Sequence, residues 1–307
     1  MPLRAIPCLP GLLLALFLLP PTPAQVPEAS PPRFDIGNTL GALAEHVSRT
    51  DELELSLTGK SWQLLALLQN GSTLRSGPHR EPIKKLVLWL RSTQAEDGRF
   101  APGGVPCGAL EQTVAAMAMV SAYGLSNYKL LQANAENAVD AIERAMSTAT
   151  EPSPPELGAM LALLGTDVAG ATALPPEQQT RVKTLAKQVL AQHTFGKTRR
   201  ADAALHLGQL LLGEPFLPEL TVARMWPANL AADPLQTVFA LFAMRHCEAK
   251  VWSAQTDLLP TLLAARTPAG DAGTWPAAAG FDAMTSTAML AMAFGIANQP
   301  QNGLRPK

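Results

Sequence analysis

Hydrophobic positions along the chain recur with helical spacing, in two distinct patterns. In the first, apolar residues repeat every three to four positions, as Ile83, Leu86, Val87 and Leu90 do, and charged residues stand between them. In the second, almost every position is apolar. Segments of this second kind lie at residues 113–123, 157–164, 203–212, 237–244 and 285–294. Runs of β-branched residues are absent, so both patterns predict helices.

The alternation of the two patterns predicts how these helices pack. A helix that is apolar on every side must be covered on every side, whereas an amphipathic helix can face water. We therefore expect an all-α fold, an α/α toroid of helical hairpins with inner apolar helices and outer amphipathic helices. An open superhelix of the TPR or HEAT type is the alternative, but its repeats are more regular in length and its paired helices usually keep a polar face.

A short polar motif separates two of the predicted helices. It reads Gln-Ala-Glu-Asp-Gly-Arg-Phe at residues 94–100, and a degraded copy, Gly-Asp-Ala-Gly-Thr-Trp, occupies residues 270–275. Repetition of a helix–turn–helix unit indicates a ring or stack of helical hairpins. The motif thus supports the architecture that the hydrophobic pattern predicts.

The first copy of this turn belongs to a longer stretch that resembles a known repeat. The stretch contains SWQLLALL at 61–68, RSGP at 75–78, the Gln-x-x-Asp-Gly-x-Phe turn and AMVSAYGLS at 118–126. It is similar to the squalene-cyclase/prenyltransferase repeat of the terpenoid-cyclase and protein-prenyltransferase α/α toroids, above all to exported bacterial members. The resemblance runs from about Leu55 to Ile296. It implies structural roles for the turn residues Gln94, Asp97, Gly98 and Phe100, and a weaker one for Trp275.

The active-site motifs of that family do not occur in this chain. There is no Asp-x-Asp-Asp cluster and no Asp-Cys-Thr-Ala-Glu element, and Arg245 stands where a zinc-binding Asp-x-Cys pair would need its Asp before Cys247. Only 5% of residues are aromatic, few for a cavity that stabilises carbocations. We therefore expect no catalytic residue, no metal and no cofactor.

The N-terminus has the composition of a signal peptide. Arg4 precedes an apolar run from Leu9 to Leu19, and small residues around Ala24 suit cleavage. An uncleaved anchor is the alternative, but the run is shorter than the roughly 20 residues that span a bilayer. The predicted organisation is a signal peptide at 1–24, a linker with an N-terminal helix at 25–54, the toroid at 55–297 and a tail at 298–307. The mature protein is expected in the periplasm or outside the cell, without a membrane span.

Charge excludes one class of partner, and the cysteines allow one covalent cross-link. The formal net charge of −1 and the scattered basic residues do not favour nucleic-acid binding. After cleavage two cysteines remain, Cys107 and Cys247, and an exported compartment would allow a disulfide between them. The stretch from Pro106 to Gln112 resembles the Cys-Gly-Glu-Gln motif of complement-type toroids, in which a Cys and a Gln three residues apart join in a thioester. Here Cys107 and Gln112 are five residues apart, a spacing that on a helix turns them to different faces and so disfavours such a thioester.

The ends of the inner helices are the predicted working surface. Glu111, Gln112, Trp275 and Asp282 are the candidate ligand contacts there. Carboxylates at these helix starts, including Asp202 and Asp233, also suit the positive end of a helix dipole and can act as caps. We therefore expect a secreted, non-catalytic binding or scaffold module for an unknown protein, hydrophobic or glycan ligand. The alternative is a divergent enzyme acting on an isoprenoid, a terpenoid or a polysaccharide.

Overall fold

The computed structural model describes residues 35–49, 56–166, 173–214, 231–245, 259–269 and 272–298. The predicted signal peptide, the predicted tail beyond residue 298, and Cys247 lie outside these ranges. Within them the protein is all-α, as the hydrophobic pattern predicts, apart from one short antiparallel hairpin of β1 (Thr267–Ala269) and β2 (Ala272–Thr274). No helix in the described part of the chain is long and apolar enough to cross a membrane.

The described residues form the following helices in chain order. They are α1 (Gly37–Arg49), α2 (Leu57–Gln69), α3 (Arg80–Thr93), α4 (Ala109–Ser126), α5 (Gln132–Ser147), α6 (Pro155–Leu164), α7 (Pro176–Leu190), α8 (Arg199–Leu211), α10 (Pro234–Arg245), α12 (Leu259–Ala264) and α13 (Ala283–Asn298). Two 3-10 turns, η1 (Pro102–Gly104) and η2 (Lys129–Leu131), precede α4 and α5.

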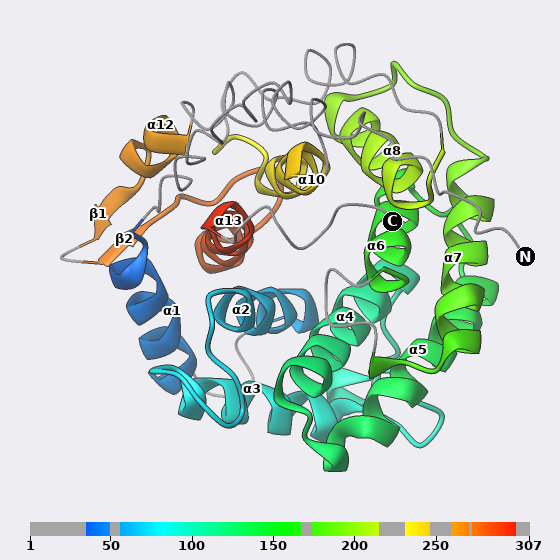
Figure 1. Cartoon of the computed structure of the whole chain (residues 1–307), viewed down its shortest axis with the longest axis horizontal. Helices are drawn as coiled ribbons and strands as arrows, with labels where there is room; N and C mark the ends of the chain where they lie inside the picture. Colours follow the sequence, from blue (N-terminus) through cyan, green and yellow to red (C-terminus); the bar gives the residue numbers. More distant parts are fainter. Residues whose placement is uncertain are drawn as a thin grey trace, which may run out of the picture. The chain divides into compact units, whose positions relative to one another are not determined.

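The helices that are apolar nearly all round form a closed circuit of contacts. Along the chain α2 packs on α4, α4 on α6, α6 on α8, α8 on α10 and α10 on α13, and α13 returns to pack on α2 (Figure 1). Five of these helices contain the five apolar segments that the sequence singles out, and α2 is the sixth. Most of their side chains are buried on all sides; in α4, for example, everything from Gln112 to Tyr123 is buried, and in α8 everything from Ala201 to Gly208.

The amphipathic helices cover this circuit from outside. Helix α3 packs on α2, α5 on α4 and α7 on α6 (Figure 1). On α3 the predicted apolar positions Ile83, Leu86, Val87 and Leu90 are all buried. The charged positions between them stay at the surface, because only one face of the helix meets a neighbour.

Helix α1 packs against elements from both the beginning and the end of the described chain. It falls in the segment 25–54 that we expected to be a linker with an N-terminal helix, and it packs against α3, α13 and β2. The hydroxyl of Thr39 donates a hydrogen bond to the carbonyl of Gly273 at 2.8 Å, across 234 residues of sequence. This contact ties the start of the described chain to the hairpin that precedes α13.

Candidate functional site

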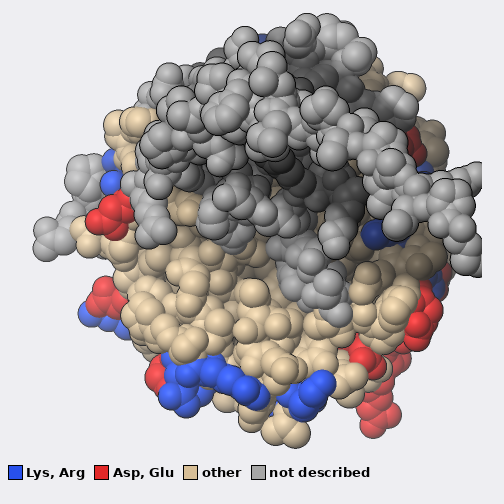
Figure 2. Space-filling model, in the orientation of Figure 1, with Lys and Arg blue, Asp and Glu red and all other residues tan. Residues whose placement is uncertain are grey.

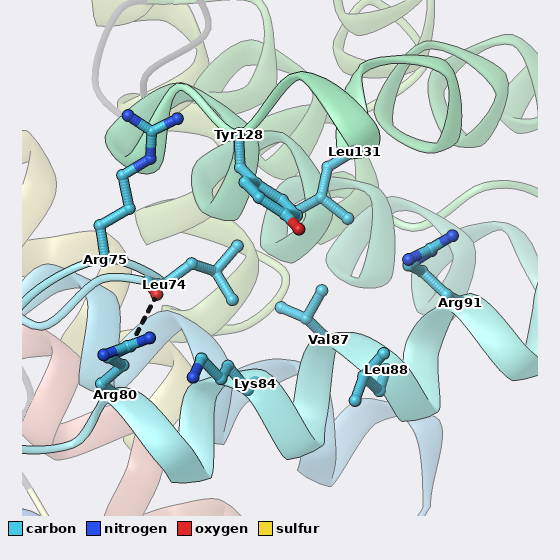
Figure 3. A pocket seen from close by; sticks show the side chains of 9 residues that line it. All are labelled: Leu74, Arg75, Arg80, Lys84, Val87, Leu88, Arg91, Tyr128 and Leu131. Carbon is cyan, nitrogen blue, oxygen red and sulfur yellow. Dashed lines mark hydrogen bonds between the residues drawn. The ribbon is translucent and has the colours of Figure 1, made fainter.

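A groove of about 530 Å³ runs along α3. One wall is α3 itself, and the other is made by the α2–α3 loop together with η2 and the residue before it (Figure 3). Its lining consists of Leu74, Arg75, Arg80, Lys84, Val87, Leu88, Arg91, Tyr128 and Leu131. The volume is within the usual range of roughly 300–1,000 Å³ for small-ligand pockets.

The periodicity of α3 places its lining side chains in one stripe. Arg80, Lys84, Leu88 and Arg91 are three or four residues apart, so they share a face of the helix. At 1.5 Å per residue this stripe is about 16 Å long. Val87 is buried beneath it and forms part of the floor. The helix therefore presents a row of cations beside apolar atoms.

The groove carries four cations and no carboxylate in its lining. Arg80 donates through Nε to the carbonyl of Leu74 at 3.2 Å, and Arg75 donates to the carbonyl of Asn127 at 3.1 Å. The bond to Asn127 orients Arg75 without neutralising it. The Arg80 guanidinium also lies 3.8 Å from the Glu81 carboxylate, which partly compensates its charge. Lys84 pairs with Glu81 at 2.7 Å on the helix surface. Burial lowers the pKa of His79, the residue before Arg80, so that it adds no charge at neutral pH.

The cations of the groove lie toward its two ends, with apolar side chains between them. Figure 3 shows Arg75, Arg80 and Lys84 at one end and Arg91 at the other, with the side chains of Leu74, Val87, Tyr128 and Leu131 between them. Figure 2 shows Lys and Arg gathered along the lower edge of the molecule, where α3 lies in Figure 1. The arrangement can bind an anion that also carries apolar groups.

The predicted structural turn, residues 94–100, is braced against α5. Gln94 donates through Nε2 to the carbonyl of Asn134 at 2.9 Å and accepts from Asn134 Nδ2 at 2.7 Å. Its backbone pairs with that of Phe100, whose ring is fully buried. The turn thus connects the end of α3 with α5 through both backbone and side chains.

Gly98 and Asp97 shape the tip of the same turn. Gly98 has φ of +84°, and a Cβ there would lie 2.1 Å from the carbonyl oxygen of Asn137, so no other residue fits. The Asp97 carboxylate accepts from the backbone N–H of Arg99 at 3.1 Å and from its guanidinium at 2.7 Å. The backbone bond, followed by the guanidinium bond, lowers the pKa of Asp97.

Gln112 is buried in the scaffold and does not reach a surface. Its Oε1 accepts from the backbone N–H of Phe100 at 2.9 Å, and its Nε2 donates to the carbonyls of Gly98 at 3.3 Å and Ala138 at 2.8 Å. An amide with every strong partner inside the protein has no group left for a ligand. Gln112 instead fastens the turn to α4 and α5.

Trp275 is buried in the same way in the second copy of the motif. Its backbone N–H donates to Thr287 Oγ1 at 3.0 Å, and its indole N–H donates to the carbonyl of Leu262 at 3.0 Å. Gly270 and Asp271, the first residues of this copy, lie outside the described residues. Because Gln112 and Trp275 are enclosed in separate hairpins, the structure does not join them into one ligand-binding surface.

The carboxylates at the helix starts accept backbone N–H groups, those of Glu111, Asp233 and Asp282 as caps and that of Asp202 from the loop before α8. Glu111 accepts from the Gly108 N–H at 3.1 Å, and Asp282 accepts from the Thr285 N–H at 2.8 Å. Asp202 accepts from the Gly196 N–H at 2.7 Å. Asp233 caps α10 through the Gln236 N–H at 3.0 Å and pairs with Arg200 at 2.7 Å. These are the bonds expected of carboxylates at the positive ends of helix dipoles.

Cys107 is a free thiol, and its supposed disulfide partner Cys247 lies outside the described residues. Its Sγ lies 3.5 Å from Gln112 Oε1, so the two side chains meet although the spacing on a helix would separate them. They meet because Cys107 precedes α4 in a loop. Burial, and next the charge of Glu111, raises the pKa of the thiol to about 11. A protonated thiol is a poor nucleophile, which argues against a thioester with Gln112.

Sequence reasoning did not find the groove. The hydrophobic pattern places the charged residues of this helix away from its buried face, and among them are Arg80 and Arg91, which are exposed, and Lys84, which is half-buried. The signal that could have found the site is Leu88, an apolar residue among those cations and 61% exposed. Part of the second wall, Tyr128 and Leu131, comes from residues some 40 positions further along the chain and required the packing of η2 beside α3.

In the part of the chain that the structure describes, no three His, Cys, Asp or Glu side chains come together as a metal site would require. Comparisons with family models, curated proteins and solved structures found no match to this chain.

Proposed function

We propose that this protein is an exported, non-catalytic binding or scaffold module on an α/α toroid. Export rests on the composition of residues 1–24. The toroid is supported by the circuit of contacts that α13 closes onto α2, and by the resemblance of residues 61–126 to the squalene-cyclase/prenyltransferase repeat. Fold resemblance leaves function open, so the argument for binding depends on the side chains.

The engagement of the helix-start carboxylates is the observation that carries the non-catalytic proposal. A divergent enzyme for an isoprenoid, a terpenoid or a polysaccharide would need a carboxylic acid or a carboxylate poised at the substrate. The four carboxylates at the helix starts each accept a hydrogen bond from a backbone N–H of their own helix end or of the adjoining loop. They are Glu111, Asp202, Asp233 and Asp282. Binding, in contrast, needs only an accessible surface of suitable chemistry, and the α3 groove supplies one.

Turnover assays test this function directly. The mature chain from residue 25 would be incubated with squalene, an isoprenyl diphosphate and soluble polysaccharides, and products would be followed by mass spectrometry and reducing-end detection. We expect no product above a buffer control. Product formation that Asp202→Asn or Asp233→Asn abolishes, in variants that keep their helical circular dichroism, would establish the enzyme alternative.

Export has its own measurement. The full chain expressed with its native N-terminus would be recovered from the periplasm or the medium, and its intact mass determined. We expect the chain to begin at Gln25. A chain that retains Met1 and sediments with membranes would show that residues 1–24 act as an anchor.

A further inference from the structure

We propose that the α3 groove is the docking site for an acidic, amphipathic peptide segment of a partner protein. This inference deepens the proposed function and rests on it, since it names the partner of a binding module. The groove is lined by Arg75, Arg80, Lys84 and Arg91 with five apolar side chains and no carboxylate. Its occupant must therefore be anionic and partly apolar.

The positions of the cations select among anionic ligands. Arg91 lies at one end of the groove, and Arg75, Arg80 and Lys84 lie toward the other (Figure 3). Along the helix Arg80 is about 16 Å from Arg91, and Lys84 about 10 Å. A single-headed amphiphile, such as a fatty acid, places its charge at one end and would leave the other end uncompensated. A segment with acidic residues on both sides of an apolar stretch matches both ends. In a helix such acids would be about 11 residues apart.

The surface around the groove also fits a polypeptide better than a small molecule. Leu88 is 61% exposed and Tyr128 39%, and two residues close to Tyr128 in sequence, Leu125 and Leu130, are 45% and 67% exposed. Exposed apolar residues that cluster beside polar ones mark interaction surfaces. Arg and Tyr are among the residues that contribute most to protein–protein affinity.

The recognition mode is a helix laid into a groove. Apolar side chains at i, i+3 or i+4, and i+7 of the partner would contact Leu74, Val87 and Leu131. Its flanking carboxylates would pair with Arg91 and with Arg80. The Arg91 carbonyl accepts the backbone N–H of Gln94 at 3.3 Å, but its side chain makes no hydrogen bond or ion pair within the described residues. The guanidinium can therefore form a two-bond pair with an incoming carboxylate.

Peptide binding to the mature chain tests the proposal. The probe is an 18-residue fluorescent peptide with Leu at i, i+3, i+7 and Glu on both flanks, measured by fluorescence anisotropy at low and physiological salt. The comparison peptides are a scrambled sequence of the same composition and a version with Gln in place of Glu. We expect the designed peptide to bind at least tenfold more tightly than either, and more weakly as salt rises.

Charge reversal locates the contact. Arg91→Glu should weaken binding of the designed peptide at least tenfold, and a peptide with Lys at the matching flank should regain affinity for this variant. Lys187→Glu makes the same charge change at an exposed position of α7, outside the groove, and should alter binding less than twofold. Circular dichroism of both variants confirms that each remains folded.

Several outcomes would overturn the proposal. Equal binding of the designed and scrambled peptides, or an Arg91→Glu variant that binds like the parent, would remove the groove as a peptide site. Decanoate that competes fully with the peptide, in an Arg91-independent manner, would assign the groove to a single-headed amphiphile. Binding to vesicles with anionic lipid but not to the peptide would assign it to a membrane surface. These experiments measure binding only, so their failure would leave the non-catalytic proposal to be decided by the turnover assays.

Discussion

The side-chain oxygen Oε1 of Gln112 accepts a hydrogen bond from the backbone N–H of Phe100 at 2.9 Å. Gln112 lies in α4, which begins nine residues after Phe100. Twelve residues separate the pair, and the same interval separates Trp275 from Thr287, whose hydroxyl accepts the Trp275 N–H at 3.0 Å. An aromatic residue before an inner helix is thus fastened by a polar side chain on that helix in both copies of the motif. The two copies of the motif in the sequence therefore correspond to two copies of this hydrogen bond in the structure.

Replacing Gln112 should destabilise the protein strongly. Gln112→Met removes the side chain that satisfies the Phe100 N–H and the carbonyls of Gly98 and Ala138. The Phe100 N–H is then left without a partner, whereas the Gly98 carbonyl keeps its bond from Gln94 Nε2 at 3.3 Å and the Ala138 carbonyl lies within helix α5. Because one buried group without a partner costs about 1–3 kcal/mol, we expect a loss of about 2 kcal/mol or more in the free energy of unfolding. Urea denaturation of the mature chain measures it, and a loss below about 1 kcal/mol would contradict the fastening role.

Gln63 provides a matched comparison on the neighbouring inner helix α2. It is as fully buried as Gln112, but neither atom of its side-chain amide has a partner within the described residues. Gln63→Met removes a desolvated amide without breaking a bond, so we expect it to be neutral or stabilising by about 1 kcal/mol. Destabilisation comparable to that of Gln112→Met would reveal a bound polar partner for Gln63 inside the protein.

Substitution of Gly98 and of Gly104 should distinguish the cost of a steric clash from the cost of a positive φ alone. Both have positive φ, 84° and 82°, but a Cβ at Gly98 would collide with Asn137 whereas one at Gly104 meets nothing within 4 Å. We expect Gly104→Ala to cost about 1 kcal/mol, the usual penalty of the left-handed region. Gly98→Ala should cost at least about 2 kcal/mol more, since the backbone must shift. Thermal unfolding of the two variants side by side checks the difference, and equal costs would place Asn137 further away.

The Cys107 thiol should be unreactive at neutral pH and should make stability depend on alkaline pH. Its pKa is raised to about 11 from 9.0, chiefly by burial, so the unfolded chain loses the proton first as pH rises. Stability is therefore retained below pH 9 and declines between pH 9 and 11. In a Cys247→Ser background, iodoacetamide should label Cys107 at pH 8 much more slowly in the native than in the unfolded protein. Equal rates would show an exposed thiolate, and Cys107→Ser should lessen the alkaline decline.

Asp282 should act as a helix cap and be replaceable as one. It accepts from the backbone N–H of Thr285 at 2.8 Å and from its hydroxyl at 2.5 Å. Asp282→Ala is expected to cost about 1 kcal/mol of unfolding free energy, and Asp282→Asn or Asp282→Ser to restore most of it, because these residues also cap helices. An Asn variant as unstable as the Ala variant would mean that the charge, and not the cap, is what the site requires.

The periodicity of the sequence by itself determined the all-α class and the division into two kinds of helix. Ile83, Leu86, Val87 and Leu90 are buried and the apolar segments are enclosed, because helical spacing alone decides which side chains share a face. The turn at 94–100 was also recognisable, since Gly98 and its neighbours belong to a compact local motif. Both are properties of residues that are close in the chain.

The partners of polar side chains were decided only by the tertiary structure. Gln112 was expected to face a ligand and is instead enclosed, because Ala138 of the next helix supplies a carbonyl at 2.8 Å. Cys107 meets Gln112 because the loop folds back before α4 begins. The α3 groove exists only where Tyr128 and Leu131 approach a helix some 40 residues earlier. Such contacts depend on how helices pack against one another, and no periodicity within a single helix records that.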